Sequence, residues 1–225
     1  MREALLDALA LALPVACAGC GADGRELCEA CRVRLAGSAP VRTATPGGIA
    51  VYAGAEYADL VQRVVLAAKD GRTTLATPLG ALLAAAGELA RTDGAIPEAV
   101  ELCVVPSTRA AFRRRGYDPA RLVLARAGLH DARVLRPARP HRAQKGLARD
   151  DRAENLRGVH RARGSLAGRV FLVVDDVVTT GATIAEAARA IREAGGEVVG
   201  ALAVAATPRR APQRTLHTRP SVKSG

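Results

Sequence analysis

The stretch at residues 170–196, VFLVVDDVVTTGATIAEAARAIREAGG, limits the possible fold of this chain more than any other part of it. Its first residues, VFLVV, form a continuous apolar run that predicts a strand buried on both faces. Its second half repeats Ala and Ile at helical spacing and places Gly195 near the end, which predicts a helix. A buried strand that leads directly into a helix is the building unit of a parallel α/β sheet.

The residues between this strand and this helix have the chemistry of a ligand site, because open α/β sheets bind ligands at the carboxyl ends of their strands. Asp175 and Asp176 suit hydroxyl groups, since carboxylates accept hydrogen bonds from a vicinal diol such as that of ribose. A helix N-terminus favours a phosphate dianion, and five residues would surround it here: Thr179, Thr180, Gly181, Ala182 and Thr183. The spacing does not match GxxxxGK[ST], which excludes a P-loop. The competing interpretation is an ordinary strand-turn-helix with surface acids.

The rest of the chain continues the α/β pattern. The predicted elements are a strand or hairpin near 49–57, strands near 100–106, 132–136 and 197–206, and helices that end near Lys69 and Ala90 or span about 118–127. With 225 residues, of which 49% are hydrophobic, the chain can bury one α/β core and carry a small appendage. We therefore expect a parallel sheet flanked by helices at 41–207, with a linker near 37–48 and a basic, disordered tail at 208–225.

Four of the five cysteines form two CxxC pairs separated by seven residues: Cys17, Cys20, Cys28 and Cys31. Each pair can place two thiolates on one side of a metal, and two pairs complete a tetrahedral shell of four sulfurs. This spacing predicts a structural zinc in an N-terminal module at residues 1–40. The alternative is two disulfides or a redox pair, which the reducing cytosol disfavours.

The N-terminal sequence MREALLDALALALPVACAGC could be mistaken for a signal peptide. Its apolar stretch runs only over residues 8–17, and Glu3 and Asp7 stand where a signal peptide needs a basic flank and an apolar core. We expect a short amphipathic helix instead, no segment long enough to insert into a membrane, and a cytoplasmic protein.

The net charge of +11 is concentrated in one segment. Residues 106–163 hold 16 Lys and Arg against 5 Asp and Glu, whereas the flanks nearly cancel, with 9 against 12 before the segment and 8 against 5 after it. This favours a phosphate-rich partner, although a solvated arginine-rich surface would give the same count. Three contiguous arginines between two aromatic residues predict a contact surface for single-stranded DNA: Phe112, Arg113, Arg114, Arg115 and Tyr117.

The motif VFLVVDDVVTTGAT resembles the phosphoribosyl pyrophosphate (PRPP) motif of type I phosphoribosyltransferases. The cysteine pairs, LAAKDGR at 66–72, VVPSTRAAFRRRGYDPARLVLARA at 104–127 and RPHRAQKGLARDDRAENL at 139–156 follow one another in the order found in the ComF family. These proteins are associated with competence and resemble phosphoribosyltransferases. One departure concerns Asp118 and Pro119, which stand where many relatives carry Asn-Gln.

This resemblance implies a type I phosphoribosyltransferase fold that binds PRPP with Mg²⁺. It implies Asp175 and Asp176 at the ribose hydroxyls and residues 179–183 around the 5-phosphate. The loop with Ser107, Thr108 and Arg109 is the candidate pyrophosphate site. The segment that contains Arg139, Gln144, Lys145 and Arg152 is expected to close over it. The catalytic candidates are Asp175, Asp176, Arg109 and Lys145.

Two functions remain open from the sequence. The first is a PRPP-binding ComF protein that takes part in DNA uptake, with single-stranded DNA and the uptake machinery as partners. The second is a nucleotide-salvage enzyme that transfers ribose 5-phosphate from PRPP to a nucleobase or a related amine. A PRPP-regulated repressor would need a DNA-reading helix, and the sequence contains no recognisable one.

Overall fold

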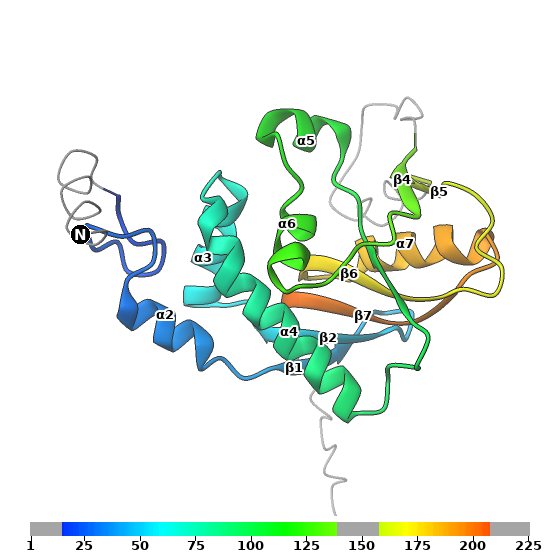
Figure 1. Cartoon of the computed structure of the whole chain (residues 1–225), viewed down its shortest axis with the longest axis horizontal. Helices are drawn as coiled ribbons and strands as arrows, with labels where there is room; N and C mark the ends of the chain where they lie inside the picture. Colours follow the sequence, from blue (N-terminus) through cyan, green and yellow to red (C-terminus); the bar gives the residue numbers. More distant parts are fainter. Residues whose placement is uncertain (1–14, 139–157, 208–225) are drawn as a thin grey trace, which may run out of the picture.

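The computed structural model describes residues 15–138 and 158–207 (Figure 1). The described elements are α2 (Glu29–Ala36), β1 (Val41–Ala44), β2 (Ala50–Glu56), α3 (Asp59–Lys69), the 3₁₀ turn η1 (Thr73–Leu75), α4 (Ala76–Thr92), β3 (Glu101–Val104), α5 (Arg109–Arg115), α6 (Pro119–Arg126), β4 (Leu135–Pro137), β5 (His160–Ala162), β6 (Val170–Val178), α7 (Ala182–Glu193) and β7 (Glu197–Ala206). The predicted N-terminal helix, the basic tail and Lys145 lie outside the described residues.

The central sheet has the strand order β1-β2-β7-β6-β3. Four of these strands run parallel, and β1 pairs with β2 in the antiparallel direction. The predicted α/β class with a mostly parallel sheet is therefore confirmed. The strand β1 falls inside the stretch at 37–48 that we expected to be a linker. Its four residues, VRTA, alternate between half-buried and exposed positions, which is too short a pattern to identify in the sequence.

Alternate residues of β6 pack into two separate cores, one on each face of the sheet. Leu172 and Val174 join the core formed with α3, α4 and α6. Phe171 and Val173 join the core formed with α7. All four side chains are fully buried. This two-sided burial explains the continuous apolar run, because a strand covered on both faces has no solvent side to alternate with.

Among the residues that the structure describes, one helix is long and apolar enough to cross a membrane, whereas the sequence predicted no such stretch. It covers Thr73–Thr92, with a mean hydropathy of 1.2. The helix packs against β2 and β7 through Leu79, Leu83 and Ala86, which are 1% exposed or less. Its apolar composition therefore matches its place in the core of the α/β domain.

The short strands β4 and β5 pair antiparallel and stand apart from the central sheet (Figure 1). The predicted strand near 132–136 corresponds to β4, whereas β5 was not predicted. Buried polar contacts hold β5 on α7. The backbone amide of His160 donates to Glu186 Oε1 at 3.1 Å, and the Arg189 guanidinium donates both to the His160 carbonyl and to the Glu186 carboxylate. Because Glu186 is ion-paired, its burial is compensated.

The two edge strands of the central sheet make different contacts on their outer sides. On the outer side of β3, the amide of Ala132 donates to the Leu102 carbonyl at 2.8 Å, and the amide of Val104 donates to Asp131 Oδ1 at 3.1 Å. At the other edge, Arg42 on β1 forms an ion pair with Asp93 at 3.3 Å.

The close approach of β2 and α4 requires glycine at position 54. A Cβ atom there would lie 2.0 Å from the Leu82 carbonyl oxygen. We expect Gly54→Ala to lower the free energy of unfolding in urea by about 3 kcal/mol, because α4 must move away from the sheet. Gly87→Ala is the matched control, since its Cβ would meet nothing closer than 4.0 Å. Equal stability of the two variants would contradict the packing described here.

Candidate functional site

The two strands beside β6 differ in length, and this difference creates the candidate site. Val104, the last residue of β3, pairs with Val174, whereas β7 accompanies β6 to Val178. Asp175 and Asp176 therefore lie inside β6, not after it as the sequence suggested, because pairing with β7 extends the strand. On the β3 side, the chain turns away after Val105, whose amide donates to the Val174 carbonyl at 2.9 Å.

The two acids differ in their surroundings. Asp176 Oδ2 lies 2.9 Å from Lys69 Nζ, at the last residue of α3. Asp175 Oδ1 accepts a hydrogen bond from the Asp176 amide at 2.8 Å. Burial and the neighbouring charge of Asp176 raise the pKa of Asp175 well above its usual value. Sequence reasoning missed Lys69 as a site residue, although its motif was noted and a helix end was predicted at this residue.

The phosphate-binding candidates gather at the start of α7. Gly181 has φ +77° and precedes the first helical residue, and a Cβ there would lie 2.8 Å from Thr45 Cγ2. Only glycine suits both constraints. The Thr180 hydroxyl accepts from the Ala182 amide at 3.3 Å. Thr179 and Thr180 are exposed, while Thr183 is half-buried in the first turn of the helix. The arrangement joins hydroxyl groups to a helix N-terminus, which suits an anion.

The candidate pyrophosphate residues follow β3 and lie beside β6 because the two strands pair. The Ser107 amide donates to Asp118 Oδ2 at 3.0 Å. The Thr108 hydroxyl caps α5 by accepting from the Ala111 amide at 3.2 Å. Arg109 is the first residue of this helix and is exposed. The sequence predicted a loop at these residues, and α5 was not expected from it. The fourth catalytic candidate, Lys145, is not among the described residues.

The unusual Asp118-Pro119 pair starts helix α6. Asp118 Oδ1 accepts from the Arg121 amide at 3.3 Å, and Pro119 occupies the first turn, where its missing N–H costs nothing. The carboxylate is 8% exposed and also holds the Ser107 amide. An acidic side chain at this position therefore has a local structural role, because both of its oxygens accept backbone hydrogen bonds.

The four N-terminal cysteines form one cluster, with their sulfur atoms within 4.8 Å of one another. All four are free thiols, and the sulfurs of Cys20 and Cys28 are 3.7 Å apart. A tetrahedral metal with bonds of about 2.3 Å separates its sulfurs by ~3.8 Å, so the cluster fits a metal such as zinc. The amides of Gly19 and Cys28 donate to Cys17 Sγ at 3.4 and 3.3 Å. Burial opposes ionisation of Cys17, but the backbone hydrogen bonds lower its pKa to about 6.

The cysteine cluster is joined directly to α3 and the turn that follows it. The Arg63 guanidinium donates to the Gly19 carbonyl at 2.7 Å, and the Arg72 guanidinium donates to the Ala16 carbonyl at 2.6 Å. Cys17 and Cys31 are 3% and 2% exposed and belong to the same apolar core as α3 and α4. Figure 1 shows this N-terminal segment beside α3, at one end of the molecule.

Comparison with known proteins supports the sequence resemblance. The model of the phosphoribosyl transferase domain matches residues 120–224. A DNA utilization protein from Salmonella typhi, YhgH, is 29% identical over 134 residues, which cover 57% of this chain. An orotate phosphoribosyltransferase from Pyrobaculum calidifontis is 62% identical over 37 residues, which cover 16% of this chain.

The Salmonella relative belongs to the ComF family, and the four-cysteine cluster precedes the phosphoribosyltransferase domain here. Together these findings support a ComF-like protein. The matches span 59% of the Salmonella protein and 19% of the Pyrobaculum enzyme, so the similarity covers less than two thirds of either relative.

The cluster geometry predicts the metal content of this ComF-like protein. We expect elemental analysis of protein prepared without added metal to find close to one equivalent of zinc, because four convergent thiols provide its preferred ligand set. Cys17→Ser should lower the zinc content, while Cys103→Ser should leave it unchanged because Cys103 is buried in β3. Protein without metal that contains Cys17-Cys20 or Cys28-Cys31 disulfides would contradict this assignment.

Proposed function

We propose that this ComF-like protein binds PRPP together with Mg²⁺ at the carboxyl end of β6. The observation that carries the proposal is the order of the functional groups at the carboxyl end of β6. Two adjacent carboxylates in β6 are followed by a hydroxyl-rich turn and by the N-terminus of a twelve-residue helix. Ribose 5-phosphate carries a diol and a phosphate separated by a few bonds, so the diol can meet the carboxylates while the phosphate meets the helix N-terminus.

In this proposal, Asp175 and Asp176 accept hydrogen bonds from the ribose hydroxyls. Residues 179–183 hold the 5-phosphate through hydroxyls and helix amides. Ser107, Thr108 and Arg109 hold the pyrophosphate, because the segment that leads into α5 follows the neighbouring strand β3. Lys69, which already contacts Asp176, contributes a positive charge at the same end of β6. Lys145 remains a candidate on the resemblance alone.

If the protein catalyses transfer, the C1–pyrophosphate bond breaks and a nitrogen nucleophile attacks the oxocarbenium-like carbon. Bound Mg²⁺ would neutralise charge on the departing pyrophosphate. The protein residues orient the sugar through its hydroxyls and phosphate, so that the carbon faces the nucleophile. This reaction defines the alternative function, a salvage enzyme acting on a nucleobase or related amine. The name of the Pyrobaculum relative supports that alternative.

Replacing both acids tests the PRPP site. We expect Asp175→Asn with Asp176→Asn to weaken Mg²⁺-dependent PRPP binding about tenfold or more, because the amides lose charged hydrogen bonds to the diol. Isothermal titration calorimetry measures the affinity directly. Asp93→Asn is the control, since it removes one carboxylate that contacts β1 and not β6. Equal PRPP affinity in the double variant and the wild type would rule out this site.

We further propose that the basic surface of α5 binds single-stranded DNA and that the protein acts in the cytoplasm during DNA uptake. The name of the Salmonella relative supports a connection with DNA. Arg113 and Arg114 are exposed, Arg115 is half-exposed, and Phe112 has 49% of its surface accessible. Phe112 is therefore available to stack on a base. Tyr117 is half-buried and donates its hydroxyl to the Ala68 carbonyl, so it contributes less than its sequence position suggested.

The salt dependence of binding tests this surface. If each arginine neutralises one phosphate, changing Arg113, Arg114 and Arg115 to Ala should reduce the slope of log affinity against log salt by about 2, at ~0.7 per phosphate. Fluorescence anisotropy with a labelled oligonucleotide measures the slope. A control with Arg32, Arg91 and Arg192 changed to Ala removes equal charge elsewhere. An unchanged slope would exclude α5, and absence of binding by the wild type at low salt would favour the salvage function.

A further inference from the structure

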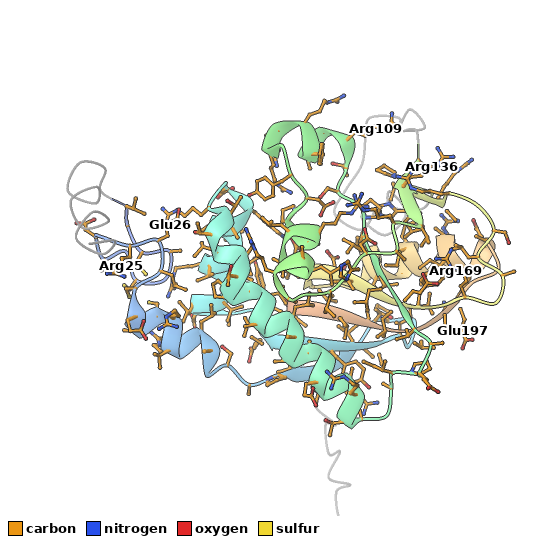
Figure 2. All side chains as sticks on the ribbon, viewed as in Figure 1. Arg25, Glu26, Arg109, Arg136, Arg169 and Glu197 are labelled. Atoms are coloured by element: carbon orange, nitrogen blue, oxygen red, sulfur yellow. The ribbon has the colours of Figure 1, made fainter. Side chains whose placement is uncertain are left out.

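A pocket of about 290 Å³ lies between α5, the start of α6 and the β4-β5 pair. Four of its lining residues are arginines, two from α5, one from α6 and one that follows β5: Arg109, Arg113, Arg121 and Arg163. Figure 2 shows Arg109 at the end of α5 that is nearer β4. Asp118 is the one acidic residue among the described lining residues. The pocket therefore has an excess of positive charge.

The acid in the pocket does not neutralise the arginine side chains by direct contact. Both oxygens of Asp118 accept backbone hydrogen bonds, from Ser107 and Arg121. The Arg121 side chain is instead fixed by Asp131, with 2.8 Å between its Nε and Oδ2. Asp131 is not part of the pocket lining.

The other three arginines, at 109, 113 and 163, form no side-chain hydrogen bond or ion pair within residues 15–138 and 158–207. Their side chains are exposed to solvent. They can therefore turn to a ligand without breaking a contact in the described part of the chain. Because Arg109 is assigned to the pyrophosphate of PRPP, Arg113 and Arg163 are the two that remain for a second ligand. Guanidinium groups suit carboxylates and phosphates, to which they donate paired hydrogen bonds.

The rest of the lining suits a flat ring. Phe112 follows Arg109 by three residues on α5, and Arg113 follows it by four, so the ring and both charges share one helix face. Leu135 and Pro137 of β4 also line the pocket, with Leu135 almost fully buried and Pro137 half-buried. An exposed aromatic ring beside apolar lining residues suits a planar molecule, which can stack on the ring.

The pocket shares Ser107 and Arg109 with the proposed pyrophosphate site and extends from it towards Arg113 and Arg163. Ser107 belongs to the pocket lining and to the loop after β3, and β3 pairs with β6 up to Val174, the residue before Asp175. The Asp118 carboxylate also acts on Asp175 through its negative charge. A molecule in this pocket therefore approaches the carboxyl end of β6 from the β3 side.

We propose that this pocket receives the second substrate or ligand of the PRPP site and that this molecule is a planar ring bearing a negative charge. The assignment of this molecule as a second substrate rests on the proposed PRPP function. The binding preference for an anion follows from the pocket itself. A neutral base of the same shape leaves the arginines without a partner and binds more weakly.

Two matched pairs of probes test the proposal: nicotinate against nicotinamide, and orotate against uracil. Each pair shares a ring. The carboxylate of nicotinate is a carboxamide in nicotinamide, and the carboxylate of orotate is a hydrogen in uracil. Ligand-observed NMR titration of the zinc-loaded full chain, with and without Mg²⁺ and PRPP, measures the affinities. We expect each carboxylate to bind about tenfold more tightly than its neutral partner, as a charged hydrogen bond would give. Equal affinities within both pairs, or no binding of any probe, would overturn the proposal.

Variants assign the preference to the pocket. Arg163→Gln and Arg113→Gln should each remove most of the difference between carboxylate and neutral probe. Arg126→Gln, on the exposed end of α6 and outside the pocket lining, should preserve it. An equal effect of all three changes would show general attraction to a basic protein and contradict the proposal. If the carboxylate preference persists while PRPP fails to bind in calorimetry, the pocket stands and the proposed PRPP function fails.

Discussion

Pairing of β6 with β7 beyond the end of β3 is the interaction on which the candidate site depends. Backbone groups in a buried strand need hydrogen-bond partners, and β7 supplies them as far as Val178. The opposite side of β6 loses its neighbour after Val174. Asp175 and Asp176 can therefore be held in a rigid strand while one side remains open for a ligand. A longer β3 would cover this opening, and a shorter β7 would leave the acids on a loop.

Helix α3 connects this site to the cysteine cluster. Its last residue, Lys69, contacts Asp176, while Arg63 within the helix holds the carbonyl of Gly19 between two of the cysteines. Tyr117 contacts the same helix end through the Ala68 carbonyl, from the turn that separates α5 and α6. The position of Lys69 thus depends on contacts from two directions. The cysteine segment acts as a support for the site, because it shares both a core and hydrogen bonds with α3.

The sequence predicted the parts of the fold that depend on strong local patterns. The apolar run at 170–174, the helical spacing in α3, α4 and α7, and the cysteine spacing each have a direct physical cause in burial or ligand geometry. Short elements escaped prediction for different reasons: the four residues of β1 are too few to show a pattern, whereas β5 owes its structure to β4 and to Glu186 on α7, which are distant in the sequence. Helix α5 is rich in arginine and has no buried residue, so it lacks an apolar period.

The same distinction applies to the site. The chemistry of Asp175 and Asp176 was evident from two acids after an apolar run, but their place inside β6 depended on the length of β7. The contact of Lys69 with Asp176 joins residues more than a hundred positions apart, and no local pattern predicts it. The arginine pocket likewise combines α5, α6 and the residues after β5, so it emerges only when these segments are assembled.

The edge strands of the central sheet affect how copies of this protein meet one another. Strands as apolar as β6 and β7 would add to strands of another molecule if they stood at an open edge. Here they occupy the centre, and the flanking strands β1 and β3 have four residues each. Asp131 and Ala132 use backbone groups of β3 that an incoming strand would need, and Arg42 places a charge on β1. Short edge strands, a charge on β1 and occupied backbone groups on β3 oppose strand addition, while the carboxyl ends of the strands stay open to a ligand.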